Sequence, residues 1–166
     1  MVTPDDYDQL PALFKYMWTC MKVFNGVGIA APQVGVFKQY CLIERMDGTV
    51  MELVNPDITR MYGREIEDFE ACLSLPPGGN GCLVPRQEYI KVQYATRHSR
   101  YSQSVTLSGR DARVAQHEID HMTGTFFIDR ASKVGRRNVL DAFENYKKAR
   151  NQRAEDHSRP LSACPA

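Results

Sequence analysis

The first apolar side chains of the chain recur every three or four positions between Asp8 and Phe24. This spacing predicts an amphipathic helix whose apolar stripe packs against a core. Pro11 lies near the start of the segment, where a helix tolerates proline, and the sequence Asn25-Gly26 ends it. The predicted stripe consists of Leu10, Leu13, Phe14, Met17, Trp18, Met21 and Phe24.

Four later segments have the pattern of β-strands, because apolar and β-branched residues are bounded by turn-forming residues. Val36–Glu44 and Thr49–Pro56 flank the turn sequence MDGT, which predicts a hairpin. Glu88–Ala95 alternates apolar and polar residues, and we expect it to pair with Ser102–Ser108 in a second hairpin. These segments predict antiparallel or mixed β-sheets.

A helix is predicted directly after the second hairpin. Ser108 is its expected N-cap, Asp111 the capping-box partner three residues later, and Gly124 lies beyond its end. A last helix is predicted from Gly135 to Arg150. We therefore expect one α+β domain over residues 1–153, with the sheets around a central helix, and a disordered tail over residues 154–166.

Composition narrows the class of protein. Hydrophobic residues make up 43% and charged residues 25% of the 166 positions, as in an ordinary globular domain. No apolar run approaches the roughly 18 residues of a membrane span. The start MVTPDDYDQL lacks the basic and apolar regions of a signal peptide, so we expect a cytoplasmic protein with no membrane partner. The five cysteines form no CxxC pair, which argues against a disulfide framework and a zinc ribbon.

Basic residues gather toward the C-terminus. Residues 1–80 carry 6 basic and 11 acidic side chains, whereas residues 81–166 carry 15 and 9. The segment from Lys133 to Arg153 holds seven basic residues against Asp141 and Glu144. This charge fits either a weak RNA footprint or a solvated helix face. We prefer the solvated face, because the basic residues do not alternate with aromatic ones as in a base-stacking surface.

The sequence AQHEIDHMTG carries the most specific chemistry. His117 and His121 are four positions apart, and Glu118 directly follows the first. On a helix this spacing puts both imidazoles on one face, as a divalent metal requires. Glu118 lies beside them, where a carboxylate can act as a general base. Two histidines do not complete a metal site, so a further ligand is expected elsewhere.

Three positions compete for that ligand. Glu144 lies downstream, as in thermolysin-like proteases, but in a segment better explained as a basic helix. Phe127 stands where metzincins carry a third histidine, and its apolar ring cannot bind a metal. Cys72 lies upstream in EDFEACLSLPP, although a lone cysteine is most often a small core hydrophobe. On these residues alone, a metalloprotease using Glu144 stays open.

The segment NGVGIAAPQVG, residues 25–35, is predicted to be a loop of small residues between the first helix and the first strand. Its lack of side chains lets a peptide backbone approach closely, and Gln33 offers an amide donor. The segment does not fit a phosphate-binding loop, since no Lys-Ser/Thr follows it and no strand precedes it.

In this order, GVGIAAPQ, EACLS and QHEIDH resemble the glycine-rich, EGCLS and HExDH motifs of the peptide deformylases, over Gly26 to about Arg130. The resemblance implies the fold of that family and hydrolysis of the formyl group of N-formylmethionyl nascent peptides. It implies one divalent metal held by Cys72, His117 and His121, with water in the fourth position. The implied metal is ferrous iron in the cell, with zinc, nickel or cobalt as substitutes.

The resemblance also implies roles for the residues around the metal. Metal-bound hydroxide attacks the formyl carbon, while Glu118 takes the proton of the water and delivers it to the leaving amine. The side-chain amide of Gln33 and the backbone N–H of Leu73 stabilise the oxyanion. The expected substrate contacts are Val27 in the methionine pocket, Gly28 through its backbone, and Ala71, which replaces the usual glycine of the family.

Two ion pairs are expected to support the site. Glu70 and Arg86 match a pair that braces the cysteine loop in the family, and Arg113 and Asp120 are seven apart on one helix face. We expect a monomer whose basic C-terminal segment contacts the ribosome. The trimmed ends resemble phage-encoded members, so the source is a bacterium or a phage. A remaining alternative is an inactive relative that binds nascent chains or ribosomal RNA.

Overall fold

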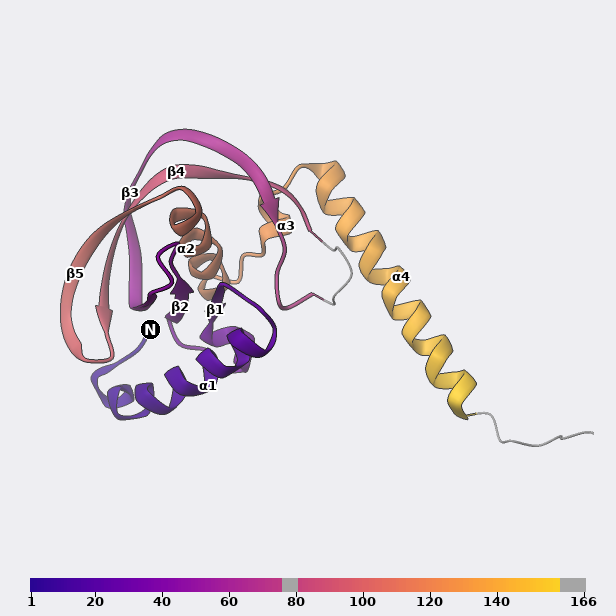
Figure 1. Cartoon of the computed structure of the whole chain (residues 1–166), viewed down its shortest axis with the longest axis horizontal. Helices are drawn as coiled ribbons and strands as arrows, with labels where there is room; N and C mark the ends of the chain where they lie inside the picture. The colour runs from indigo at the N-terminus through magenta and orange to yellow at the C-terminus, as the bar shows by residue number, and fades with distance from the viewer. Residues whose placement is uncertain (76–80, 159–166) are drawn as a thin grey trace, which may run out of the picture.

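A computed structural model describes the backbone of residues 1–75 and 81–158, with side chains described as far as Arg153. Five antiparallel strands form one sheet in chain order, β1-β2-β3-β4-β5, and the predicted α+β class is confirmed (Figure 1). The elements are η1 (Pro4–Gln9), α1 (Leu10–Val23), β1 (Gly28–Ala30), η2 (Ala31–Val34), β2 (Tyr40–Glu44), β3 (Val50–Glu70), β4 (Cys82–Thr96), β5 (Ser99–Ser108), α2 (Gly109–Met122), α3 (Phe127–Arg130) and α4 (Lys133–Ser158).

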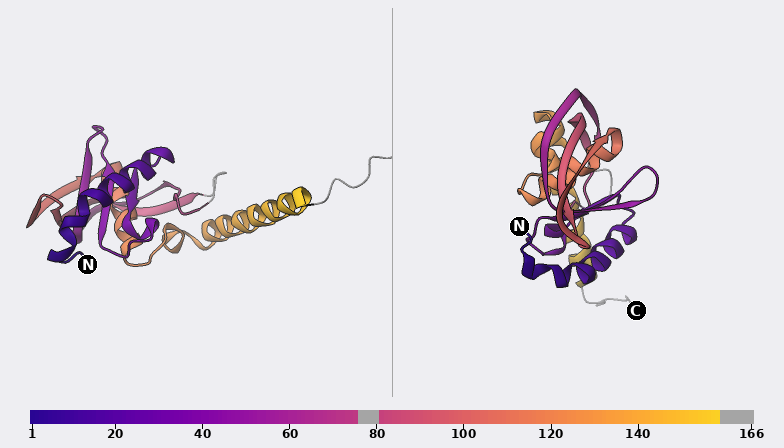
Figure 2. Two further views of the ribbon diagram at one scale, coloured as in Figure 1. Left: turned by 90° about the horizontal axis from the view of Figure 1, so that it is seen from below. Right: turned by 90° about the vertical axis from the view of Figure 1, so that its left-hand side faces the viewer.

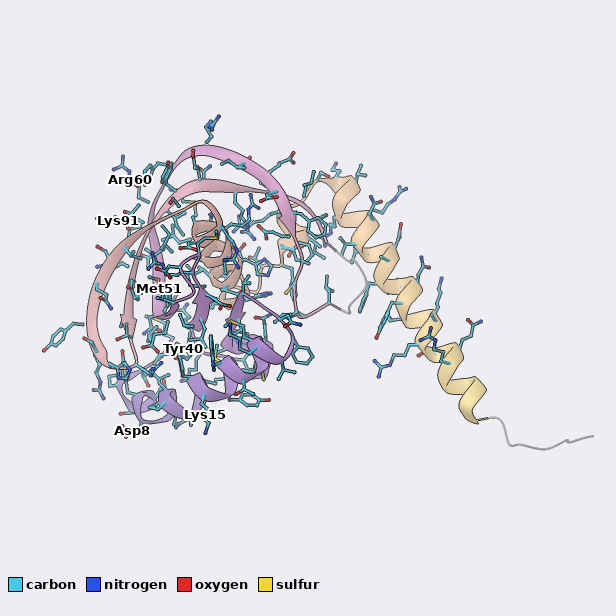
Figure 3. The ribbon with its side chains drawn as sticks, in the orientation of Figure 1. Asp8, Lys15, Tyr40, Met51, Arg60 and Lys91 are labelled. Atoms are coloured by element: carbon cyan, nitrogen blue, oxygen red, sulfur yellow. The ribbon has the colours of Figure 1, made fainter. Side chains whose placement is uncertain are left out.

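The N-terminal helix forms where the apolar spacing predicts it. Pro11 lies in the first turn of α1, and Met17 and Met21 are fully buried. They pack in one cluster with Tyr40 and with Leu42 of β2. Figure 3 shows Tyr40 close to α1, whereas Lys15 and Asp8 point away from the sheet. The helix therefore closes one side of the sheet that carries β1 and β2.

The first predicted hairpin is present, but its second strand is much longer than expected. β2 pairs with the start of β3 from Tyr40↔Val54 to Glu44↔Val50. β3 then continues to Glu70, far beyond the Pro56 predicted as its end. Every residue from number 59 to 69 is exposed, so this stretch has no buried face to produce an alternating pattern. This part of β3 is a strand because its backbone pairs with that of β4.

The second predicted hairpin and the central helix are also confirmed. β4 pairs with β5, and both curve around α2, as Figure 1 shows. Ala112 and Ala115 of α2 pack against Ile90 and Leu107 of this hairpin. These small side chains let the helix lie close to the sheet, which brings the face with the two histidines toward the ends of β1 and β3.

One detail at the start of α2 differs from the prediction. Ser108 is the N-cap residue, but its side chain makes no capping hydrogen bond. Asp111 does not complete a capping box either, because its carboxylate accepts hydrogen bonds from the Met46 N–H at 3.0 Å and from Arg45 Nε at 3.3 Å. The predicted capping box is therefore wrong, since the β2–β3 turn supplies partners that local sequence cannot reveal.

The last helix leaves the body of the molecule. Figures 1 and 2 show α4 projecting outward, with only its beginning near the sheet. Val139 is buried there, and Gly135 lies against Cys82 of β4. The helix continues to Ser158, beyond the Arg150 predicted as its end, and the rest of the predicted tail, residues 159–166, lies outside the described residues. No helix in the described part of the chain is long and apolar enough to cross a membrane.

Candidate active site

Three of the predicted metal ligands converge in space. His117 and His121 lie on one face of α2 with ring centroids 5.0 Å apart, and Cys72 follows directly after the end of β3. One donor atom from each of the three residues lies within 4.8 Å of the others, and Cys72 Sγ is 3.2 Å from His121 Nε2. Two imidazoles and a thiolate form a suitable donor set for one divalent ion, with a position left for water.

The two other candidates for the third ligand do not join this group. Glu144 lies on the projecting helix α4, where its carboxylate is exposed and pairs with Lys147 at 2.8 Å. Phe127 is close to the site, but as a neighbour of a ligand: its ring stacks on His117 with centroids 5.9 Å apart. The sequence alone left open which residue is the third ligand. In the structure it is Cys72, 45 positions before His117, that lies beside the two histidines.

The predicted pair of Glu70 and Arg86 is present, and Glu70 also holds the ring of His117, one of the predicted metal ligands. Arg86 donates to both carboxylate oxygens of Glu70 at 2.9 Å. Glu70 Oε2 also lies 2.9 Å from His117 Nδ1, which leaves Nε2 of that ring to face Cys72 and His121. Burial alone raises the pKa of Glu70, but the hydrogen bonds from His117 and Arg86 outweigh it and hold the pKa at about 2.

The predicted pair of Arg113 and Asp120 is wrong. Arg113 instead donates to Glu70 Oε1 and to the carbonyl of Val84, both at 2.8 Å. Asp120 accepts from Arg86 Nη1 at 2.5 Å, and from Arg130 Nε and Nη2 at 2.6 and 2.5 Å. Seven residues along a helix span about 10 Å. Residues of β3 and β4 therefore lie closer to Arg113, and residues of β4 and α3 closer to Asp120, than these two residues lie to each other. Sequence reasoning missed Arg130, because nothing in the helical pattern points to a residue beyond the helix end.

Electrostatics favour the ionised form of the sulfur ligand. Burial raises the pKa of the Cys72 thiol, but hydrogen bonds from His117 and His121 outweigh burial and lower it to about 5. The Ser74 N–H and Gln33 Nε2 also lie 3.5 Å from the sulfur. The thiolate is the form of cysteine that binds metals.

Glu118 is buried beside the ligands with unused hydrogen-bonding capacity. Its side chain is almost fully enclosed, and Oε2 is the buried side-chain oxygen that lacks a partner among the described residues. Burial raises the pKa of this carboxyl group to about 7, although His117 and His121 oppose the shift. A Cβ at Gly28 would lie 2.4 Å from Glu118 Oε1, so glycine is needed there for the carboxylate to fit.

The glycine-rich segment is more ordered than the predicted loop. Gly28–Ala30 forms the edge strand β1, because it pairs with Cys41–Ile43 of β2. Gln33 follows in η2, where its Oε1 accepts from the Ala30 N–H at 2.8 Å. This bond turns Nε2 toward the metal-binding residues, 3.1 Å from Ser74 Oγ. The predicted amide donor therefore faces the site.

A cleft of about 1030 Å³ opens beside His117 and Glu118. The residues predicted to contact substrate or oxyanion all line it: Gln33, Val27, Gly28, Ala71 and Leu73. Among described residues other than glycine, only Asn25 and Asn55 have positive φ, so Ala71 carries no left-handed strain. The methyl group of Ala71 therefore narrows the cleft without adding backbone strain.

Sequence reasoning missed part of the cleft wall. Phe24, Ile66 and Phe69 line the cleft with exposed apolar side chains. Ile66 and Phe69 lie in the part of β3 that was not predicted as a strand, so no sequence signal placed them here. An open, largely apolar cleft beside a metal-binding group and an edge strand is suited to an extended peptide.

Comparisons with known proteins agree with this geometry. The sequence model of the polypeptide deformylase family matches residues 2–137. Peptide deformylase of Chloroflexus aurantiacus is 38% identical over 139 residues, which covers 73% of this chain and 71% of that protein. Peptide deformylase of Desulfitobacterium hafniense is 42% identical over 113 residues, covering 68% and 72% of the two chains.

Solved structures show the same fold. The crystal structure of peptide deformylase from Thermus thermophilus aligns with a TM-score of 0.76 and 35% identity, covering 93% of this chain and 88% of that one. Peptide deformylase of Plasmodium falciparum aligns with a TM-score of 0.77 and 29% identity, over 89% and 88% of the two chains.

Proposed function

The chain belongs to the peptide deformylase family, metal-dependent hydrolases that remove the N-formyl group from nascent peptides, and from this premise we propose which of its residues carry the reaction. One observation carries the assignment: the donor atoms of Cys72, His117 and His121 lie together beside the buried carboxylate of Glu118, whose Oε2 has no hydrogen-bond partner among the described residues. A structural metal site has no need of such a carboxylate, whereas hydrolysis requires a base at that position.

Cys72, His117 and His121 are the proposed metal ligands. A bound divalent ion would lower the pKa of a coordinated water toward 7 and so supply hydroxide at neutral pH. Glu70 fixes the His117 ring through Nδ1, and a bound divalent ion would itself hold the sulfur of Cys72 as the thiolate. The proposed ion is Fe(II), which a mixed thiolate and imidazole set accepts, and zinc, nickel or cobalt fit the same donors.

Glu118 is the proposed general base and acid. Water supplies the oxygen that bonds to the formyl carbon, and Glu118 takes the proton of that water. The carbon–nitrogen bond then breaks, and Glu118 returns the proton to the nitrogen, releasing formate and a free amine. The carboxylate suits both steps because it is buried beside the proposed ligands and its Oε2 has no partner among the described residues. Burial raises the pKa of this carboxyl group.

The remaining cleft residues bind and orient the peptide. Gln33 Nε2 and the backbone N–H of Leu73 are the proposed donors to the oxyanion, and the contact of Gln33 with Ser74 fixes the amide. Gly28, which lies in the edge strand β1 and lines the cleft, is the proposed partner for the substrate backbone. Val27 and Ala71 are the proposed apolar contacts of the methionine side chain.

The proposed setting is a monomer that meets nascent chains in the cytoplasm, because one chain supplies every residue of the site. A ribosome contact is proposed for α4, which projects from the body and carries the seven basic residues between Lys133 and Arg153. None of the described residues of α4 lines the cleft.

A formate-release assay tests the proposed function. Protein reconstituted with Fe(II) or Ni(II) is mixed with formyl-Met-Ala-Ser, and we expect stoichiometric formate and free amine. Cys72→Ala should lose both the bound metal and the activity. Metal binding that persists in Cys72→Ala would contradict the proposed ligand set, and absence of formate from the loaded protein would favour a binding protein without activity.

A further inference from the structure

The short helix α3 lies against both histidines of the metal-binding group. Phe127 stacks on His117 with ring centroids 5.9 Å apart and an interplanar angle of 21°. Its neighbour Phe126 meets the ring of His121 edge to face, at 5.5 Å and 85°. Both distances fall in the range over which aromatic rings attract each other. Two consecutive residues therefore contact one imidazole each.

The same short helix is bonded to α2 between those imidazoles. Arg130 donates two hydrogen bonds to the carboxylate of Asp120, the residue directly before His121. The Thr125 N–H also donates to the Asp120 carbonyl at 3.0 Å. These polar contacts fix the position of α3 along α2, so the rings of Phe126 and Phe127 stay in place against the histidines.

Other contacts hold α3 in turn. Its N-terminus is closed by Asp129, whose carboxylate accepts from the Phe126 N–H at 2.9 Å and pairs with Arg136 of α4. Phe127 is buried in one cluster with Val139 of α4 and with Cys72. The base of the projecting helix thus packs behind the aromatic pair.

We propose that Phe126 and Phe127 are positioning residues that hold the His117 and His121 rings at the angles required for metal binding. The proposal rests on the proposed ligand set. Of the two histidines, His117 has a hydrogen-bonding partner on the far side of its ring, Glu70 at Nδ1, and no described residue does the same for His121. Phe127 supplies a second restraint on the ring of His117, and Phe126 supplies a ring contact for His121. Loss of the hydrogen-bonding partners of metal ligands typically weakens metal binding about 10–100-fold, and we expect loss of these ring contacts to act in the same direction, at the lower end of that range.

The test compares Phe127→Leu and Phe126→Leu, which retain apolar bulk but remove the flat rings. Phe126→Tyr keeps the ring at a half-exposed position, and Phe37→Leu changes an exposed phenylalanine elsewhere. Each protein is loaded with Co(II). The measurements are the affinity for Co(II) in competition with a chelator, the visible absorption spectrum of the bound ion, and the thermal stability of the metal-free protein.

The two leucine variants at α3 should bind Co(II) about tenfold more weakly and show shifted absorption bands, while Phe126→Tyr and Phe37→Leu retain the original values. Unchanged affinity and spectrum in the leucine variants would overturn the proposal. The proposal would also be overturned if the absorption spectrum stayed unchanged and the loss of Co(II) affinity merely paralleled a loss of thermal stability of the metal-free protein. That result would mean that the two rings act through packing alone. If the unmodified protein shows no thiolate-to-cobalt absorption, the ligand set itself is wrong and this inference falls with it.

Discussion

Helices α2 and α4 differ in what holds them. Seven of the 14 residues of α2 are buried, and its polar side chains bond to β3, β4 and α3. In α4, Val139 is the buried residue among those with described side chains, and the pairs Arg137–Asp141 and Lys147–Glu144 are local. Distant parts of the chain thus fix α2 along its length, whereas α4 is attached at its base, through Arg136 and Val139, and its described side chains beyond Val139 are mostly exposed.

The largest expected difference is in the rate of formate release, between variants of one glutamate on α2 and one on α4. Glu118→Gln removes the proposed proton carrier, and we expect formate release to fall about 10²–10⁴-fold with metal content unchanged. Glu144→Gln, on α4, should leave turnover unaltered, since this residue is exposed. Steady-state formate release and metal analysis of both variants check the prediction. Near-normal turnover in Glu118→Gln would contradict the proposed mechanism.

A second prediction compares a buried ion pair with an exposed one. Arg86→Ala leaves the buried carboxylates of Glu70 and Asp120 without a shared partner. We expect a loss of about 3–5 kcal/mol in the free energy of unfolding. Lys147→Ala breaks the exposed pair with Glu144 and should cost no more than about 1 kcal/mol. Urea unfolding of the metal-free proteins measures both, and equal losses would refute the comparison.

A third prediction lies within α4 itself. Val139 is 2% exposed and packs against α3, whereas its neighbour Leu140 is 39% exposed. Val139→Ala should lower the free energy of unfolding by about 1–2.5 kcal/mol, and Leu140→Ala by less than about 0.5 kcal/mol. Thermal or urea unfolding distinguishes the two. A larger effect at Leu140 would mean that α4 packs through its other face.

The smallest effect is expected at the far end of α4. A chain that ends after Lys148 loses the last turns of the helix, whose described residues are exposed. Its melting temperature and its turnover on formyl-Met-Ala-Ser should match those of the full chain, because the described side chains that are removed, residues 149–153, are exposed. Its sedimentation with ribosomes should weaken, since Arg150 and Arg153 are gone. Reduced turnover on the free peptide would show that α4 contributes to the cleft.

The sequence predicted features that depend on local spacing. The period of apolar residues located α1, and the spacing of His117 and His121 placed both on one face of α2. Cys72 and Gln33 were assigned by resemblance to a family, and the structure brings both to the same cleft. Their positions follow from the path of the sheet, which no local pattern encodes.

Features set by tertiary partners escaped prediction. The outer half of β3 is exposed throughout, so it has no apolar alternation. Asp111 and Arg113 carried plausible local partners, but the β2–β3 turn and Glu70 bind them instead. Phe127 was considered only as a failed metal ligand, although its ring lies against His117. In each case a contact between distant segments determines the role of the residue.

The separation of Cys72 from the two histidines has a further consequence. An ion held by these side chains links positions 45 residues apart at the nearest, from Cys72 to His117, around the hairpin of β4 and β5. Such a cross-link removes conformational entropy from the unfolded chain, and a loop of this length makes the gain substantial. A divalent ion bound by the three proposed ligands would therefore also cross-link the chain, and chelators should lower the resistance of the whole β4–α2 region to proteolysis.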